Sequence, residues 1–395
     1  MTTSRIIGVD VARALALLGM VVAHMRDGVN ATNGSLDPWH QLVAGRSSAL
    51  FAVLAGLSIV LATSSASTDG QPSLRPNART ALVCRAVLIA TIGLLLGSFA
   101  EGIAVILTYY GLLFLCALPV LRWRARSLAL LAVGWGVTAP IVSLVLRPFL
   151  PRPSLNIPAP SSLADPLRLM GELLFTGYYP VLTWATYLIA GMALGRLDLG
   201  SRLVSLRLAL GGGVLATISI GVSALVTRSV NVQQSLIDTY DREDVGDWSE
   251  LSDTLTSGLF GTTPTGSFWW LAVWSPHTGS IVDLAHTVGC ALVILGLALA
   301  GTSRLTQGGR RVASVIFGAG SMTLTLYVAH VLTLALPAGW GWAFEISVHV
   351  MVLAVIGAIF ALGRARGPLE WLVAESSRAA ASTADPTRES PAFRP

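Results

Sequence analysis

GVDVARALALLGMVVAHM, residues 8–25, is apolar enough to be a membrane-spanning helix, yet it carries Asp10, Arg13 and His24. Arg13 and His24 are eleven residues apart, which at about 100° per residue places both side chains within about 20° of one helical face. Charged side chains that face lipid are strongly disfavoured. We therefore predict a polar stripe that faces other helices or a cavity, with the Asp10–Arg13 pair about 16 Å from His24 along the axis.

The composition of the chain excludes an ordinary soluble protein. Of its 395 residues, 53% are hydrophobic and only 12% are charged, whereas soluble domains average roughly 25% charged residues. Apolar stretches of spanning length recur from end to end. The expected fold is an all-α polytopic membrane helix bundle of about ten transmembrane helices, at residues 6–25, 47–66, 81–99, 103–121, 128–146, 179–197, 204–227, 280–301, 313–335 and 341–362.

The basic residues predict the orientation of this bundle. All of them are Arg, and they recur in alternate loops, at residues 75–79, 122–126, 196–207, 304–311 and 364–366. Such loops are cytoplasmic under the positive-inside rule, so both termini are expected in the cytoplasm. The net charge of +5 then belongs to loops that face anionic lipid headgroups, and no nucleic acid partner is implied. Exclusive use of Arg is typical of a GC-rich genome and favours a bacterial plasma membrane.

Residues 1–366 are expected to form a single transmembrane domain. Three outer loops interrupt it, at residues 27–46, 148–178 and 228–279, and the last of these is acidic. The tail at 367–395 is rich in small and polar residues, which predicts disorder. The three cysteines are odd in number and fall inside expected spans, so no disulfide framework is implied.

Titratable side chains gather at one depth of the expected bundle. All six histidines lie at or above mid-membrane on the external side, namely His24, His40, His277, His286, His330 and His349. Two of them follow an acid at helical spacing, as in Asp283–His286, and buried structural pairs would have the same spacing. We interpret the cluster as a polar chamber in which a neutral histidine serves as general base. His277, Asp283 and His286 carry the nitrogen and oxygen atoms that zinc accepts as ligands. Their spacing in the sequence is common by chance, so no metal is expected.

Several motifs resemble a known group of membrane enzymes. Arg13, ten residues and His24 match the R-x10-H pattern in the first helix of the acyltransferase-3 membrane enzymes. The wider run at 8–25, followed by GRSSALFAVLAGLSIVLAT at 45–63, is more similar to the heparan-alpha-glucosaminide N-acetyltransferase catalytic family and its bacterial relatives. Other similar segments are ILTYYGLLFL from Ile106, GYYPVLTWATYLIAGMALGR from Gly177 and GAGSMTLTLYVAHVL from Gly318. The resemblance therefore covers most of the chain.

The resemblance implies a transmembrane acyltransferase. Such an enzyme takes an acyl group, usually acetyl, from cytoplasmic acyl-CoA and delivers it to an extracytoplasmic acceptor. It would use acetyl-CoA or another acyl-CoA as donor, and a glycan or glycolipid of the cell envelope as acceptor. The basic loops would hold the CoA phosphates, and the Asp10–Arg13 end of the first helix would line the entry for the pantetheine arm. The oligomeric state is left open, a homodimer included.

Within this scheme, either His24 or His40 would carry the chemistry. Lysosomal members of the family have an amide where His24 stands, and their candidate histidine lies in the first lumenal loop. The loop histidine here is His40, in PWHQLVAGR, whose neighbours match poorly, so we favour His24. It would act as a general base or be acylated transiently. Candidates for contacting substrate, by depth alone, are Tyr178, His277, Asp283, His286, Tyr327 and His330.

Two other interpretations compete with this one. Asp10 and Arg13 could form only a structural ion pair, with Arg13 extending to the cytoplasmic surface. Ionisable residues inside a helix bundle also mark transporters and lipid flippases. Against a transporter, the sequence contains no evident inverted repeat and no matched pair of broken helices. Binding of acyl-CoA would separate the two classes.

Overall fold

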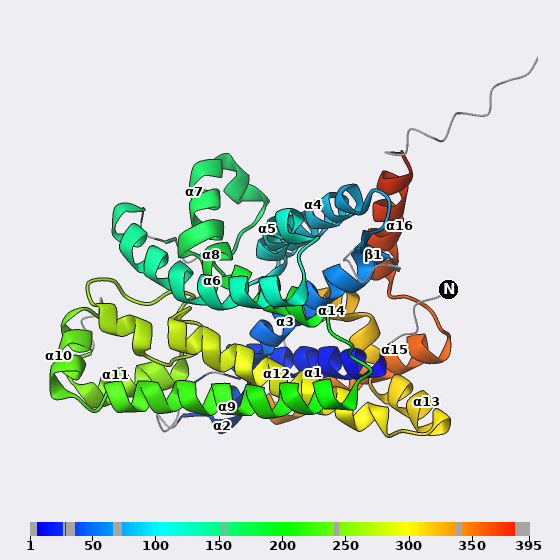
Figure 1. The fold of residues 1–395 in the computed structure, drawn as a ribbon. Helices are drawn as coiled ribbons and strands as arrows, with labels where there is room; N and C mark the ends of the chain where they lie inside the picture. Colours follow the sequence, from blue (N-terminus) through cyan, green and yellow to red (C-terminus); the bar gives the residue numbers. More distant parts are fainter. Residues whose placement is uncertain are drawn as a thin grey trace, which may run out of the picture.

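The computed structural model of the protein describes residues 6–26, 28, 36–65, 73–100, 102–151, 153–154, 156–240, 245–336 and 342–383. Helices dominate this part of the chain, and its two strands, β1 (Ser64–Ser65) and β2 (Ser73–Leu74), form a short antiparallel pair. The long helix α9 (Arg202–Val226) packs on α12 (Ile281–Ser303), which packs in turn on α1 (Ile7–Met25) (Figure 1). The expected all-α polytopic membrane bundle is confirmed.

Each of the ten expected spans corresponds to an apolar helix. Seven helical segments of the described chain are long and apolar enough to cross a membrane, and three further apolar helices are shorter. The remaining helices of this set are α3 (Arg46–Thr63), α4 (Ala78–Gly97), α5 (Leu107–Cys116), α6 (Ala125–Leu146), α8 (Val181–Leu194), α14 (Thr323–Leu334) and α15 (Trp342–Leu362). The three shorter ones are α8, α14 and the segment that joins α5 to the 3-10 turn η1 (Leu118–Val120).

The expected continuous span at 313–335 is wrong, because this segment is divided. Helix α13 (Gln307–Ile316) ends first, a 3-10 turn η6 (Gly318–Ser321) follows, and α14 begins at Thr323. The break lies directly against α1, since a Cβ added at Gly320 would be 1.8 Å from the carbonyl oxygen of Asp10. The absence of a side chain at Gly320 thus lets the broken segment approach the first helix.

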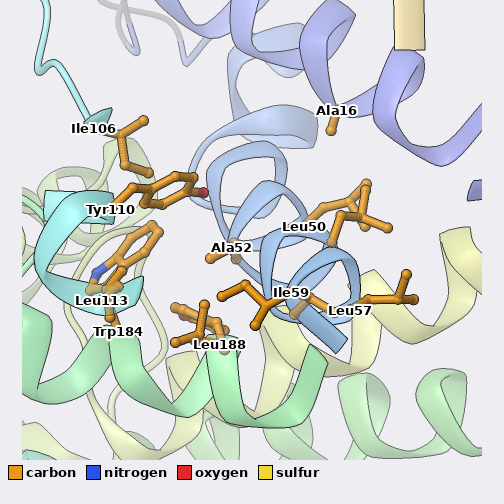
Figure 2. Packing of buried hydrophobic residues seen from close by; sticks show 14 of the residues in the cluster. Ala16, Leu50, Ala52, Leu57, Ile59, Ile106, Tyr110, Leu113, Trp184 and Leu188 are labelled. Carbon is orange, nitrogen blue, oxygen red and sulfur yellow. The ribbon is translucent and has the colours of Figure 1, made fainter. Parts of the chain in front are cut away.

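Helix α3 lies at the centre of the packing. It contacts α1, α8 and α12, and buried apolar side chains fill the space around it (Figure 2). It crosses α8 very closely: a Cβ at Gly56 would lie 2.0 Å from the Leu188 carbonyl oxygen, and one at Gly191 would lie 1.8 Å from that of Val53. Small residues at such crossings let membrane helices pack tightly where lipid supplies no hydrophobic drive.

One end of the bundle, which we call the loop end, carries the three expected outer loops. Segment 228–279 forms α10 (Val230–Asp238), α11 (Trp248–Ser257) and the 3-10 turn η5 (Phe268–Ala272). These pack around their own core, which includes Leu236, Leu251 and Trp270. Segment 148–178 holds most of η2 (Arg147–Phe149), then η3 (Pro160–Ala164), α7 (Pro166–Gly171) and the π-helical η4 (Glu172–Thr176), and segment 27–46 holds α2 (Pro38–Val43). Residues 27 and 29–35 of that first loop lie outside the described residues.

The opposite end, which we call the arginine-rich end, contains β1, α13 and α16 (Figure 1). Arg196 Nη1 donates to the Ser64 hydroxyl at 2.8 Å, and its Nη2 donates to the Leu121 carbonyl. Arg75 Nε donates to the Ser64 carbonyl at 3.0 Å. The ends of α3, η1 and α8 are thereby joined by guanidinium hydrogen bonds, so several of the basic loops meet at one end of the bundle.

The expectation of a disordered tail is wrong for residues 368–383, which form α16 (Pro368–Thr383). Glu370 accepts hydrogen bonds from the backbone amides of Leu324 and Thr325, at 2.7 and 3.2 Å, where α14 begins. A carboxylate is stabilised at a helix N-terminus. Val373 is 3% exposed, so apolar burial adds to this cap. The polar composition of the whole tail concealed both features, and residues 384–395 lie outside the described residues.

Candidate active site

Two cavities enter the bundle from its two ends and share one lining residue, Met20 of α1. The arginine cavity, of about 560 Å³, is lined in part by Arg13, Arg85, Tyr110, Tyr327 and Glu370. The histidine cavity, of about 450 Å³, is lined in part by His24, His40, Ser48, Tyr178 and His277. Met20 is only 4% exposed. The two cavities therefore approach each other at a single buried thioether on the first helix.

A third cavity, of about 500 Å³, adjoins the histidine cavity at the loop end. It shares Tyr178 and Phe260 with that cavity, and Ile157, Glu172 and Thr176 also line it. Glu172 is engaged there, because its Oε1 accepts a hydrogen bond from the Ser154 amide at 2.9 Å. The loop end thus offers one polar and one more apolar compartment side by side.

Polar residues of α1 line both main cavities. Arg13 lines the arginine cavity and His24 lines the histidine cavity. Arg13 Nη1 lies 3.4 Å from Asp10 Oδ1, and Arg13 Nη2 donates to the Ser58 hydroxyl on α3. Asp10 is 5% exposed. The Asp10–Arg13 pair is therefore held inside the bundle, beside the arginine cavity.

Arg85 adds a second guanidinium to the arginine cavity. It lies within α4, and its Nε is buried without a hydrogen-bond partner. The guanidinium carbon lies 5.6 Å from the centre of the Phe114 ring, which supports a cation–π contact. A buried donor without a partner carries a desolvation cost that an anionic ligand would relieve. The arginine cavity is accordingly suited to a negatively charged ligand.

His277 is fixed by unusual backbone geometry in the histidine cavity. Its φ is +60°, and its Nε2 accepts a hydrogen bond from the Gly45 amide at 3.0 Å. The ring centre lies 4.8 Å from that of Tyr178. Burial lowers the pKa of His277 to about 3, with smaller contributions from His40 and His24, and burial raises the pKa of Tyr178 to about 12. Both rings are therefore neutral at ordinary pH.

The depressed pKa of His277 predicts a pH-dependent stability. The unfolded chain binds a proton at the ordinary pKa of 6.5, whereas the folded chain does so only at about 3. The stabilisation from keeping this ring neutral is complete above pH 6.5 and is lost as the pH falls toward about 3. We expect His277→Gln to lose less thermal stability than wild type between about pH 7 and about pH 4. Equal losses in melting experiments would contradict the assignment.

The start of α3 also faces the histidine cavity. Gly45, Ser47 and Ser48 line it, and the first amides of a helix have no intrahelical acceptor. His40 enters from α2, whose first turn is fixed by Asp37, which accepts hydrogen bonds from the Trp39 and His40 amides at 2.9 Å each. Helix N-termini favour negative charge. This cavity thus combines imidazoles with a helix N-terminus, at which negative charge is favoured.

Two expected site residues lie on α14, close to the two main cavities. Tyr327 lines the arginine cavity, and its buried hydroxyl has no hydrogen-bond partner of good geometry. His330, 1% exposed, lines none of the three cavities, but its Nε2 lies 3.3 Å from His24 Nδ1. Tyr327 and His330 therefore meet the site from α14, which the break at η6 brings against α1.

Asp283 and His286 lie outside the three cavities. Asp283 Oδ2 accepts a hydrogen bond from the Gly279 amide at 3.0 Å, at the start of α12. His286 instead meets Arg46 Nε at 3.2 Å and the Ala216 carbonyl at 3.2 Å. The structural pair that this spacing allowed is not formed, because Asp283 bonds to the loop just before α12 and His286 bonds to Arg46 and Ala216. Among the described residues, no group of three or more His, Cys, Asp and Glu side chains is arranged to hold a metal ion.

Three residues of the cavities were missed from the sequence. Arg85 is a charge inside an expected membrane span, which is itself a functional signal. Glu370 was assigned to a disordered tail, and nothing in its local sequence indicates that it caps α14. Met20 is one apolar residue among many on α1, and only the three-dimensional structure shows that it separates two cavities.

Comparison with known protein families completes the description of the site. The family model described as "Heparan-alpha-glucosaminide N-acetyltransferase, catalytic" matches residues 5–226, which are 222 of the 395 residues. The match runs from α1 to α9 and includes Arg13, His24 and Arg85. His277 and His330 lie beyond it. No match to the chain is found among curated proteins.

Proposed function

The chain belongs to the heparan-alpha-glucosaminide N-acetyltransferase catalytic family, and from this premise we propose that it transfers an acetyl group across a bacterial plasma membrane. The donor is cytoplasmic acetyl-CoA, which enters at the arginine-rich end. The acceptor is a glycan or glycolipid of the envelope, which enters at the loop end. Both termini are then cytoplasmic, in agreement with the positive-inside rule.

The observation that carries this proposal is the meeting of two cavities at Met20. A transferase that joins substrates from opposite sides of a membrane needs two entrances and one point of contact. The arginine cavity opens among basic side chains, including Arg75 and Arg366, which suit the phosphates of CoA. The histidine cavity contains the imidazoles. Movement of the flexible Met20 side chain would join the two compartments.

The donor would place its charged part at the arginine-rich end and its thioester near Met20. Arg85 would bind a phosphate or a pantetheine carbonyl, because its buried Nε has no hydrogen-bond partner. Tyr327, whose hydroxyl is likewise without a good partner, would donate to the pantetheine arm. The linear arm would extend along the cavity toward Met20, while the nucleotide would stay near the entrance.

The acceptor would react in the histidine cavity with His24 as general base. As the acceptor oxygen or nitrogen attacks the thioester carbon, His24 removes its proton. The amides at the start of α3 would stabilise the negative charge on the carbonyl oxygen. Tyr178 would contact the acceptor from the cavity wall. Transient acylation of His24 is the variant of this scheme in which the imidazole itself attacks.

The test is transfer of radiolabelled acetyl from acetyl-CoA to an extract of the source cell envelope by purified protein in lipid nanodiscs. The expected result is a labelled envelope product that depends on the protein. Acetyl-CoA should also raise the melting temperature. If no labelled product forms and acetyl-CoA does not change the melting temperature, the proposal is abandoned. Those results would instead fit a transporter or lipid flippase.

Arg85→Gln should weaken donor binding. Hydrogen bonds to charged groups contribute about 1.5–3 kcal/mol, so the KM for acetyl-CoA should rise roughly 10- to 100-fold, with little change in kcat. Initial rates at varied acetyl-CoA would measure both constants. Arg378→Gln is the control, because Arg378 on α16 is exposed, lies outside the basic loops and does not line the arginine cavity. Equal KM values for the two variants would remove Arg85 from the donor site.

A further inference from the structure

Three histidines from three helices form a continuous chain of contacts that begins at the histidine cavity. His24 Nδ1 on α1 lies 3.3 Å from His330 Nε2 on α14. His330 Nδ1 lies 3.1 Å from His349 Nδ1 on α15. His330 is 1% exposed, whereas His24 and His349 are partly exposed. The chain therefore runs from a cavity wall, through the interior, to a helix on the outside of the bundle.

The ring positions show that the nitrogens face each other. The ring centres are 5.4 Å apart for His24 and His330, and 5.3 Å apart for His330 and His349. These separations exceed the N–N distances of 3.3 and 3.1 Å by about 2 Å, which is the contribution of two ring radii when the nitrogens lie on the line between the centres. Both contacts are thus edge-to-edge N–H···N hydrogen bonds, and neither is a face-to-face stack.

Such a chain has a definite order of protons when all three rings are neutral. A neutral imidazole has one N–H donor and one acceptor nitrogen. If His24 Nδ1–H donates to His330 Nε2, then His330 Nδ1–H donates to His349 Nδ1, and His349 carries its own proton on Nε2. His24 Nε2 is then left with a lone pair. This order gives a residue of the histidine cavity the basic nitrogen that a general base requires.

We infer that His330 and His349 form a proton relay for His24, in which both are positioning residues that spread the positive charge formed when His24 takes a proton from the acceptor. This inference rests on the proposed function. An isolated imidazolium inside the bundle would be strongly destabilised. Sharing the proton moves the charge toward His349, which lies one helical turn from Glu345, within its electrostatic influence.

The three histidines neither gain nor lose protons over one complete reaction. As the acceptor atom bonds to the thioester carbon, its proton moves to His24 Nε2. The Nδ1 proton of His24 moves to His330 Nε2, and the Nδ1 proton of His330 moves to His349 Nδ1. When the carbon–sulfur bond breaks and sulfur leaves with the electron pair, the hops reverse and His24 Nε2 protonates the sulfur. The products are the acylated acceptor and CoA thiol, and the three rings regain their starting tautomers.

Other titratable groups near the chain are few among the described residues. The Tyr327 ring lies 6.2 Å from the His24 ring. His277 and His40 line the same cavity as His24 from the loop end. Glu345 is the acid that acts on His349. Arg26 also lines the histidine cavity, where it is paired with Asp37. The Glu345 carboxylate is at the far end of the chain and draws the proton away from His24 during the reaction.

The first test reads the tautomers directly and needs no activity. Protein labelled with 15N-histidine in lipid bilayers is measured by solid-state NMR, with the six histidines assigned from single His→Gln variants. The expected result is protonation of Nδ1 in His24 and His330 and of Nε2 in His349, with couplings across both N–H···N bonds. A His24 protonated on Nε2, or the absence of both couplings, would overturn the relay.

The second test separates a relay from simple packing. His349→Ala should lower kcat for acetyl transfer about 10-fold, leave the KM for acetyl-CoA unchanged, and regain activity when free imidazole is added at the partly exposed site. Ser347→Ala, on the exposed side of the same helix, is the control and should keep wild-type kcat without an imidazole effect. Wild-type kcat in His349→Ala, or a loss that imidazole leaves unchanged, would overturn the relay. A wild-type protein that transfers no acetyl group but shows the expected tautomers would refute the proposed function while the hydrogen-bonded chain stands.

Discussion

His24→Ala is expected to abolish most acetyl transfer, with kcat lowered by about 10²- to 10⁴-fold, because a general base supplies an effect of that size. The substitution removes both the basic nitrogen in the histidine cavity and the first member of the histidine chain. The protein should still fold, since His24 is partly exposed and near the end of α1. Single-turnover transfer of labelled acetyl, beside melting curves with and without acetyl-CoA, measures chemistry and donor binding separately.

The competing candidate in the same cavity supplies the control for His24. His40→Ala alters the lining at α2 but leaves the chain of His24, His330 and His349 intact, so it should reduce transfer far less. If His40→Ala is the inactive variant and His24→Ala the active one, the roles are reversed. Rapid quenching followed by mass spectrometry distinguishes the two uses of His24, because an acyl-histidine would be found only if the imidazole attacks.

Sequence periodicity was sufficient to predict which side chains share a face of a single helix. The alignment of Arg13 with His24 follows from the helical repeat, and the structure places them at two cavities that meet between them. Hydropathy likewise located the ten apolar helices. Such predictions succeed because the bilayer imposes length and polarity on each span independently of its neighbours.

Features that depend on contacts between distant segments could not be predicted in this way. His286 follows Asp283 at helical spacing, but its partner in the bundle is Arg46, at the start of α3. The tail was judged from average composition, whereas Glu370 is ordered by the amides of α14. The contact of His330 with His24 needs the break before α14, and the Gly- and Ser-containing segment at 318–321 was taken as part of one continuous span.

Gly191→Ala should cause a large loss of stability, of about 3 kcal/mol. The added Cβ would lie 1.8 Å from the Val53 carbonyl oxygen, 2.7 Å from its carbon and 3.0 Å from the Leu57 amide. These are backbone atoms of α3, so no side-chain rotation can relieve the overlap. Either α8 moves away from α3 or the hydrogen-bonded backbone distorts, and both changes disturb the helix that carries Ser47 and Ser48 into the histidine cavity.

Gly211→Ala is the matched control, because a Cβ there meets nothing within 4 Å and Ala favours a helix over Gly by about 1 kcal/mol. Thermal unfolding in lipid nanodiscs should therefore show a large drop in melting temperature for Gly191→Ala and none for Gly211→Ala. Since the overlap is local to the α3–α8 crossing, acetyl-CoA should stabilise whatever Gly191→Ala protein remains folded. Equal melting temperatures for the two variants would mean that α3 and α8 do not cross at Gly191, and the position of α3 beside both cavities would have to be revised.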